Sequence, residues 1–199
     1  MSVRFADESD LGFGWSESAR VQRTSHALVA HGGVWIIDPI AGDGVDERIG
    51  ALGEPAGVIQ LLNRHTRDSE AFAARLGVPL HVVPPSLPGT PFEFRPVVRG
   101  RWWREVALWW PERRVLACAD VLGTIPFFRV GDEPVGVHPI LRLRPPRSLR
   151  GLGVEHLLVG HGDGLHGDGT AAAVDDALRH ARARIPRWLV GVPRIVRAR

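Results

Sequence analysis

Polar side chains that can hold a metal ion follow three apolar runs of the chain. VIQLL precedes the loop at residues 63–69, RVLACA precedes Asp120, and EHLLV precedes the glycine-rich tract at residues 160–169. Each run has the length of a buried strand, and the ends of neighbouring strands can meet at one pocket. Carboxylates and imidazoles in such a pocket bind divalent metals, which activate water for hydrolysis. The sequence therefore predicts one site built from three loops, with Asp38 nearby at the end of VWIID.

The patterns around these loops predict the elements that position them. Alternating or apolar runs indicate strands, and periodic segments between a capping residue and a glycine indicate helices. An antiparallel meander is expected in the middle, and the last helix is expected to have Thr170 as its N-cap and to be broken by Pro186. The expected strands lie at 23–30, 33–40, 56–62, 79–83, 92–98, 105–110, 114–119 and 155–160, and the expected helices at 45–53, 68–77 and 169–184. This order predicts sheets that pack together with helices outside.

The order of four segments resembles that of the metallo-β-lactamase fold superfamily. The segments are VWIIDP, LLNRHTRDS before a helix, EVALWWPERRVLACAD, and LLVGHGDG before a final helix, and they cover residues from about 21 to 184. The resemblance implies an α/β fold, a four-layer αββα sandwich. It also implies one domain over residues 1–199, with an arginine-rich C-terminal tail at about 186–199.

The resemblance also implies a set of metal ligands. In that superfamily the first loop reads HxHxDH, and further ligands come from a GH step, a strand-end aspartate and a GHG step. In this sequence those positions fall on Arg64, Thr66, Asp68, Ser69, Arg101, Asp120 and His161. An arginine has no lone pair to give a metal, so the three-histidine metal position is expected to be empty. Asp68, Asp120 and His161 are then the predicted ligands of at most one divalent metal, which is zinc, manganese or iron.

Arg64, Arg101 and His65 are the predicted substrate-binding residues. His65 falls between two ligand positions of the resemblance, and an alignment shifted by one residue would change that. Two functions remain open. In a metal-dependent hydrolase, the two arginines would hold the anionic group of a small ester, thioester, amide or phosphoester. In a catalytically inactive, metal-free protein, they would instead pair with Asp68 and Asp120, and the pocket or surface would bind a ligand or another protein.

The tract GHGDGLHGDG at residues 160–169 allows two other interpretations. Its glycines match GxGxxG, but its aspartates would repel a phosphate, and too little chain follows for the rest of a dinucleotide-binding unit. Its own residues His161, Asp163, His166 and Asp168 could also bind a metal by themselves. Of the other histidines, His26, His81, His138 and His156 lie in strand-like segments and are expected to be ordinary core or surface residues.

Composition excludes several classes of protein. No run reaches the roughly 18 apolar residues of a membrane helix, and no secretory signal is recognised, so a cytoplasmic protein without a membrane partner is expected. Cys118 is the single cysteine, which excludes an internal disulfide or a cysteine-rich zinc cluster. Residues 177–199 carry seven arginines and no acid, a composition that can bind nucleic acid. A solvated helix followed by a packed tail is the favoured interpretation, and a small-molecule ligand is the expected partner.

Overall fold

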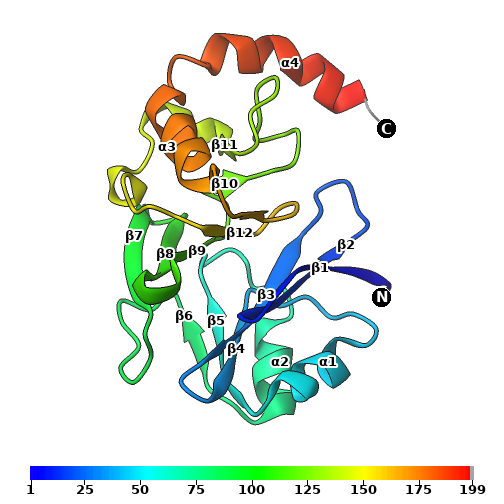
Figure 1. The fold of residues 1–199 in the computed structure, drawn as a ribbon. Coiled ribbons are helices and arrows are strands. Elements are labelled where there is room, and N and C mark those ends of the chain that lie inside the picture. The colour runs from blue at the N-terminus through cyan, green and yellow to red at the C-terminus, as the bar shows by residue number, and fades with distance from the viewer. Residues whose placement is uncertain (198–199) are drawn as a thin grey trace.

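Two β-sheets form the centre of the molecule, as Figure 1 shows. The computed structural model describes residues 1–197, and their side chains as far as residue 191. The first sheet has the spatial order β1 (Val3–Ser9), β2 (Gly12–Glu17), β3 (Thr24–Ala30), β4 (Gly33–Ile37), β5 (Pro55–Gln60) and β6 (Leu80–Val82). The second has the order β13 (Leu165–His166), β12 (His156–Val159), β9 (Val115–Cys118), β8 (Arg104–Trp110) and β7 (Glu93–Arg99). A separate pair is formed by β10 (Leu122–Gly123) and β11 (Gly136–Val137).

Helices cover the outer face of each sheet. The α-helices are α1 (Val45–Leu52), α2 (Ser69–Leu76), α3 (Thr170–His180) and α4 (Ile185–Arg197), and three short 3-10 helices are Pro111–Arg113, Pro139–Leu143 and Arg147–Leu149. One apolar cluster joins α1 and α2 to the first sheet, and another joins α3 to the second. A third cluster, which includes Leu28 and Leu108, fills the space between the sheets. These clusters define four layers and confirm the predicted αββα sandwich.

The sequence patterns account for most of these elements. β3 and β4, two of the expected strands, form an antiparallel hairpin, and His31 and Gly32 at its turn have the positive φ values that such a turn requires. α2 ends at Gly77, whose left-handed backbone lets its N–H bond back to the last turn. β7, β8 and β9 form the predicted antiparallel meander.

Two expectations about the C-terminal region are wrong. α3 is capped by Gly169, which has a left-handed backbone, and Thr170 is its first helical residue. Pro186 does not end a helix; it is the second residue of α4, where a missing N–H costs no intrahelical hydrogen bond. The arginine-rich tail at 186–199 is therefore helical as far as Arg197, and its last two residues lie outside the described part of the chain. No helix of the described residues is both long and apolar enough to span a bilayer.

Parallel pairing brings the polar loops together. β12 lies parallel to β9, with Val159 opposite Cys118, so residues that follow the two strands by the same number of positions remain neighbours. Asp120 and His161 each lie two residues beyond these partners. β4 and β5 are parallel in the other sheet, and Asp38 follows β4 directly. An isolated bridge between Arg23 and His161 connects the two sheets at this edge.

Candidate metal centre

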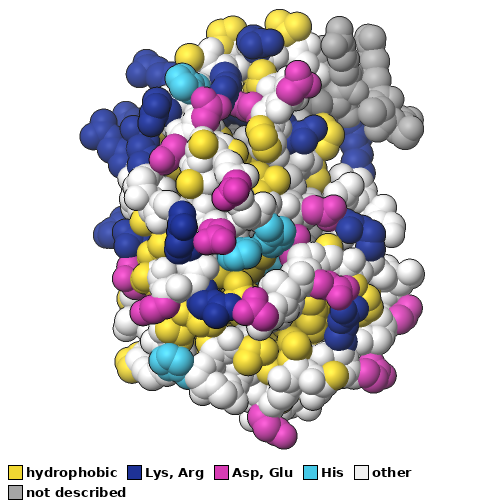
Figure 2. Space-filling view, in the orientation of Figure 1, with side chains coloured by type: hydrophobic (Ala, Val, Ile, Leu, Met, Phe, Trp, Pro, Cys, Tyr) yellow, Lys and Arg dark blue, Asp and Glu magenta, His cyan; other side chains and the backbone are white. Residues whose placement is uncertain are grey.

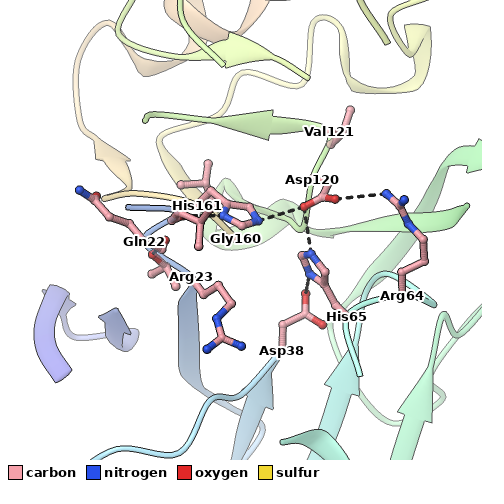
Figure 3. Close-up of polar contacts among 12 residues, drawn as sticks. Gln22, Arg23, Asp38, Arg64, His65, Asp120, Val121, Gly160 and His161 are labelled. Carbon is pink, nitrogen blue, oxygen red and sulfur yellow. Dashed lines mark hydrogen bonds and ion pairs between the residues drawn. The ribbon is translucent and has the colours of Figure 1, made fainter. Parts of the chain in front are cut away.

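Three side chains from three loops converge on one point between the sheets. His65 Nε2 lies 3.0 Å from Asp120 Oδ1, and His161 Nε2 lies 3.1 Å from the same oxygen. Figure 3 shows Asp120 at the end of β9, with the two imidazoles approaching it from different directions. Within the described part of the chain this is the one group of three or more His, Cys, Asp or Glu side chains whose ligand atoms all lie within 4.8 Å of one another.

The surroundings of the two imidazoles favour a free lone pair on each converging nitrogen. His161 Nδ1 lies 2.6 Å from the Val21 carbonyl oxygen, which can only accept, so Nδ1 carries the proton and Nε2 has a lone pair. His65 Nδ1 has no hydrogen-bond partner among the described residues, but it lies 3.7 Å from an oxygen of Asp38, and this negative charge favours the tautomer with the proton on Nδ1. Asp120 Oδ1 is buried, and despite the two short contacts no N–H of the described residues is aligned on it as a hydrogen bond. Three lone-pair donors directed at one point fit a divalent metal.

The electrostatics of the group fit the same interpretation. Burial alone would raise the pKa of Asp120, but contacts with His161 and His65 outweigh burial and hold this pKa well below its ordinary value. Burial would lower the pKa of His65, but Asp120 and Asp38 outweigh it, and the pKa is raised. The site therefore presents an ionised carboxylate to two imidazoles, an arrangement that attracts a cation.

Arg67 holds the loops of the site together, a role that the sequence patterns do not predict. Its guanidinium donates to the backbone carbonyls of Thr24 (2.7 Å), Asp38 (2.9 Å) and Gly160 (3.0 Å). These carbonyls belong to the start of β3, the end of β4 and the residue before His161. Burial lowers the pKa of this guanidinium, opposed by the charges of Asp38 and Asp120. No sequence motif marks such a residue, because its three partners are backbone groups.

Glu105 supports the other side of the site, and it too was missed. Its side chain is fully buried; Oε1 accepts the backbone N–H groups of Asp120 and Val121, each at 2.9 Å, and Oε2 accepts Trp103 Nε1 at 2.9 Å. Burial, followed by the charge of Asp120, raises the pKa of Glu105 to about 7. A lone acidic residue in the strand EVALWW is the signal that could have indicated it, since a buried carboxylate requires several partners.

The predicted site residues are brought together only in part. Asp68 lies apart from the converging atoms: its Oδ2 accepts the Ala41 N–H at 2.6 Å, and the chain turns through the left-handed residue Arg67 just before it. Instead, His65 lies beside Asp120 and His161, a position that agrees better with an alignment shifted by one residue. The metal set Asp68, Asp120 and His161 was predicted from the resemblance alone, which could not show how this loop turns.

The two arginines predicted to hold substrate differ in position. Arg64 extends to the site: its guanidinium lies 3.5 Å from Asp120 Oδ2 and 4.6 Å from the centre of the Trp103 ring. Arg101 is exposed in the turn between β7 and β8, where its guanidinium lies 5.3 Å from the Trp102 ring centre. Arg64 is therefore the arginine that the structure places beside Asp120, as Figure 3 also shows.

A large apolar pocket opens beside the converging side chains. Its volume is about 620 Å³, and Asp120 and His161 form part of its wall together with Arg20, Val21, Gln22, Ile125, Pro126, Phe127, Phe128 and His138. The Phe128 ring is stacked on His161, with the ring centres 5.7 Å apart. A pocket of this size and lining suits a small molecule with an apolar body.

His138 in the pocket wall should make the stability of the protein depend on pH. Burial, opposed by Asp120 and assisted by Arg64 and His161, lowers the pKa of His138 from 6.5 to about 4. Below pH 6.5 the unfolded chain takes up a proton that the folded protein does not, so the free energy of unfolding falls as the pH drops toward 4.

We expect this contribution to be absent from His138→Phe, which retains an aromatic ring beside Trp103 and Phe128. Between pH 7 and pH 5 the wild type should lose about 2 kcal/mol more than the variant, as measured by urea unfolding. Equal losses in the two proteins would show that His138 titrates normally.

Comparison with known proteins supports the architecture. No protein-family model and no curated protein sequence matches the chain. Among solved structures, the metallo-β-lactamase DIM-1 exposed to ceftazidime is 12% identical, with a TM-score of 0.59 over 94% of this chain and 97% of that one. A putative diflavin flavoprotein A 5 fragment from Nostoc sp. PCC 7120 is 13% identical, with a TM-score of 0.62 over 92% and 98%. The metallo-β-lactamase FIM-1 from Pseudomonas aeruginosa, in its mono-zinc form, is 8% identical, with a TM-score of 0.56 over 92% and 97%.

Each similarity extends over nearly the whole of both chains, although the sequence identities are low. We conclude that this chain has the metallo-β-lactamase fold.

Proposed function

We propose that the protein is a metal-dependent hydrolase that binds one divalent metal through His65, Asp120 and His161. One observation carries the proposal: the free Nε2 atoms of both imidazoles and one oxygen of Asp120 converge at the wall of a pocket of about 620 Å³. Two imidazoles and one carboxylate that leave further positions open are a ligand set of catalytic zinc and of non-haem iron. Such a metal supplies Lewis acidity and a water of lowered pKa.

The surrounding residues hold these donor atoms in place before a ligand binds. The Val21 carbonyl fixes the ring of His161, Asp38 faces the ring of His65, and Glu105 accepts the backbone N–H of Asp120. Contacts of this kind orient metal ligands and raise their affinity. Conformational entropy that the loops have already lost in the free protein does not have to be lost on binding.

The pocket and Arg64 favour a substrate with an apolar body and a negative or developing negative charge. Phe127, Phe128 and Ile125 supply the apolar wall. The Arg64 side chain is about half exposed and reaches within 3.5 Å of Asp120, so a small rotation would direct its N–H groups at an anionic group of the substrate. Small esters, thioesters, amides and phosphoesters have this chemistry.

A second candidate function is ligand binding without catalysis. The observation that favours it is the contact between Arg64 and Asp120, because a guanidinium in that place can neutralise the carboxylate as a metal would. In this alternative the same pocket binds a small molecule, and the converging imidazoles only hold the loops together.

Metal content separates the two functions. After loading with zinc, manganese or iron and removal of the excess, we expect Asp120→Asn to hold one metal equivalent less than the wild type by elemental mass spectrometry. Asp68→Asn is the matched control: it changes the same chemical group in an adjoining loop, and it should hold as much metal as the wild type. A loss of metal in both variants would show that the metal uses the ligand set expected from the resemblance, Asp68, Asp120 and His161, and a loss in Asp68→Asn alone would contradict both ligand sets. No metal in any of the three proteins would leave the ligand-binding alternative.

The apolar wall gives a second test of the hydrolase. On a series of p-nitrophenyl esters of lengthening acyl chain, kcat/KM should rise by about fourfold for each CH₂ that enters the pocket. Phe127→Ala should flatten this dependence, since Phe127 is partly exposed at the pocket wall. Hydrolysis that is absent in the metal-loaded wild type, or unchanged in Asp120→Asn, would contradict catalysis at this site.

A further inference from the structure

A second cluster of titratable side chains lies apart from the candidate metal centre. It contains Asp7 on β1, His26 on β3, His156 on β12 and His166 on β13, so both sheets contribute to it. All four residues line a small cavity of about 10 Å³. Figure 2 shows histidine side chains beside acidic ones at mid-height of the drawn face.

Hydrogen bonds link most of this cluster. Asp7 Oδ1 lies 3.0 Å from His166 Nε2 and accepts the Gly164 backbone N–H at 3.0 Å. His166 Nδ1 lies 3.1 Å from His156 Nδ1, so one of these two nitrogens carries the proton that they share. The contacts tie β1 of the first sheet to β12 and β13 of the second.

Two buried atoms of the cluster face each other without a hydrogen-bond partner. His26 Nε2 lies 3.0 Å from the Val159 carbonyl oxygen and must donate to it, so Nδ1 is left with a bare lone pair. This Nδ1 lies 3.9 Å from Asp7 Oδ2, both side chains are 4% exposed, and neither atom has a partner among the described residues. Two acceptors that face each other in the interior repel, and a cation between them removes the repulsion.

The protonation states of Asp7 and His26 also favour a bound cation. Burial would raise the pKa of Asp7, but the hydrogen bond from His166 and the neighbouring imidazoles lower it, so this carboxylate is ionised. Burial lowers the pKa of His26, which keeps its imidazole neutral. The interior therefore holds a negative charge next to a neutral ligand nitrogen.

Two glycines keep the space around the carboxylate open. A Cβ at Gly14 would lie 3.0 Å from both Asp7 Oδ2 and His26 Nδ1. A Cβ at Gly164 would lie 2.9 Å from Asp7 Oδ1 and 3.0 Å from His166 Nε2. The remaining wall is largely apolar and includes Leu11, Phe13, Leu28 and Leu158. A single water would fit by size and could donate to both unpartnered acceptors. Its own oxygen, however, would find few donors in this wall.

We propose that Asp7, His26 and His166 bind a second divalent transition metal, with His156 orienting His166. Metal–ligand bonds of about 2.0–2.1 Å in tetrahedral geometry place neighbouring donor atoms about 3.3 Å apart. The contacts of Asp7 with His166 (3.0 Å) and with His26 (3.9 Å) lie on either side of this spacing. The donor atoms of the three residues do not yet all lie within 4.8 Å of one another, so metal binding requires side-chain rotations that bring His26 and His166 together. Imidazole nitrogens with one carboxylate suit zinc. The metal would hold β1 and β3 against β13, and its role would be structural.

The test uses Asp120→Asn as its background, so that the candidate metal centre does not contribute. After zinc loading we expect one equivalent of zinc in Asp120→Asn and none in Asp120→Asn combined with Asp7→Asn. Asparagine suits position 7, where the backbone has a positive φ. Zinc should also raise the Tm of the single variant by about 5 °C and leave the Tm of the double variant unchanged.

Further variants keep the outcome decisive. His166→Gln in the same background changes a more accessible ligand, 35% exposed, and should also lose the zinc if Asp7→Asn fails to fold. A crystal of zinc-loaded protein should show anomalous density at the zinc edge between Asp7 and His26. An ordered water in that place, or no zinc in Asp120→Asn, would overturn the proposal. Equal zinc in the wild type and in Asp120→Asn would instead overturn the candidate metal centre and leave this second site standing.

Discussion

Replacing Arg67 by methionine should lower the free energy of unfolding by about 3–4 kcal/mol. The side chain is half-buried with its Nε fully buried, and its guanidinium bonds three backbone carbonyls that are far apart in the sequence, at 2.7 to 3.0 Å. Methionine fills much of the same space but donates no hydrogen bond, and it leaves the charges of Asp38 and Asp120 without their neighbouring cation. Urea unfolding of the two proteins at pH 7 measures the difference.

Arg75→Met is the matched control for this prediction. Arg75 forms a two-bond ion pair with Asp46 on the surface, where both side chains are partly exposed. An exposed pair contributes about 0–1 kcal/mol, so the control should stay within about 1 kcal/mol of the wild type.

Arg67→Lys should fall between the wild type and Arg67→Met, because a single ammonium cannot reach all three carbonyls in the geometry of the guanidinium fork. If Arg67→Met unfolds at the same urea concentration as the control, Arg67 does not hold the loops together.

Arg67→Met should also weaken metal binding at the candidate centre. Arg67 bonds the Gly160 carbonyl, and Gly160 directly precedes His161. Loss of such a supporting contact costs about 10–100-fold in metal affinity, which zinc titration against a competing chelator would detect. A fall in stability with no change in affinity would limit Arg67 to the fold.

The layers of the fold could be predicted because the signals for them are local. The runs VWIID and VIQLL have no charged residue before their ends, as strands buried on both faces require, and α2 has a glycine where its left-handed cap falls. The hairpin of β1 and β2 was not predicted, although every residue of β2 is buried. Acidic and small residues dominate that segment, so its burial arises from pairing with β3 and from packing against distant parts of the chain.

The candidate site could be predicted only as far as its loops. Asp120 and His161 follow apolar strands, and the sequence shows that directly. Within NRHTRDS, Arg67 binds backbone carbonyls far away in the sequence, and in the loop so formed His65 rather than Asp68 lies beside Asp120. Interactions of a side chain with the backbone of other strands leave no pattern in the sequence.

Glu105 gives the other large expected effect. Glu105→Leu should cost about 3 kcal/mol of unfolding free energy, because it leaves three buried donors without an acceptor: two backbone N–H groups, of Asp120 and Val121, and the Trp103 indole. Leucine fills the space but accepts nothing, and the affected backbone carries the metal ligand itself. Denaturant unfolding together with the near-UV signal of the buried tryptophans would measure both the loss of stability and any change around Trp103.

Glu105→Gln separates hydrogen bonding from charge. Its amide oxygen can still accept both backbone N–H groups, while its NH₂ would face the donor of Trp103, so we expect a cost of about 1 kcal/mol. Because burial raises the pKa of Glu105 to about 7, the charge that glutamine removes is one that the folded protein holds only in part at neutral pH. If glutamine were as destabilising as leucine, the ionised carboxylate would be the group that matters. If both variants were as stable as the wild type, the strand end would hold Asp120 without Glu105.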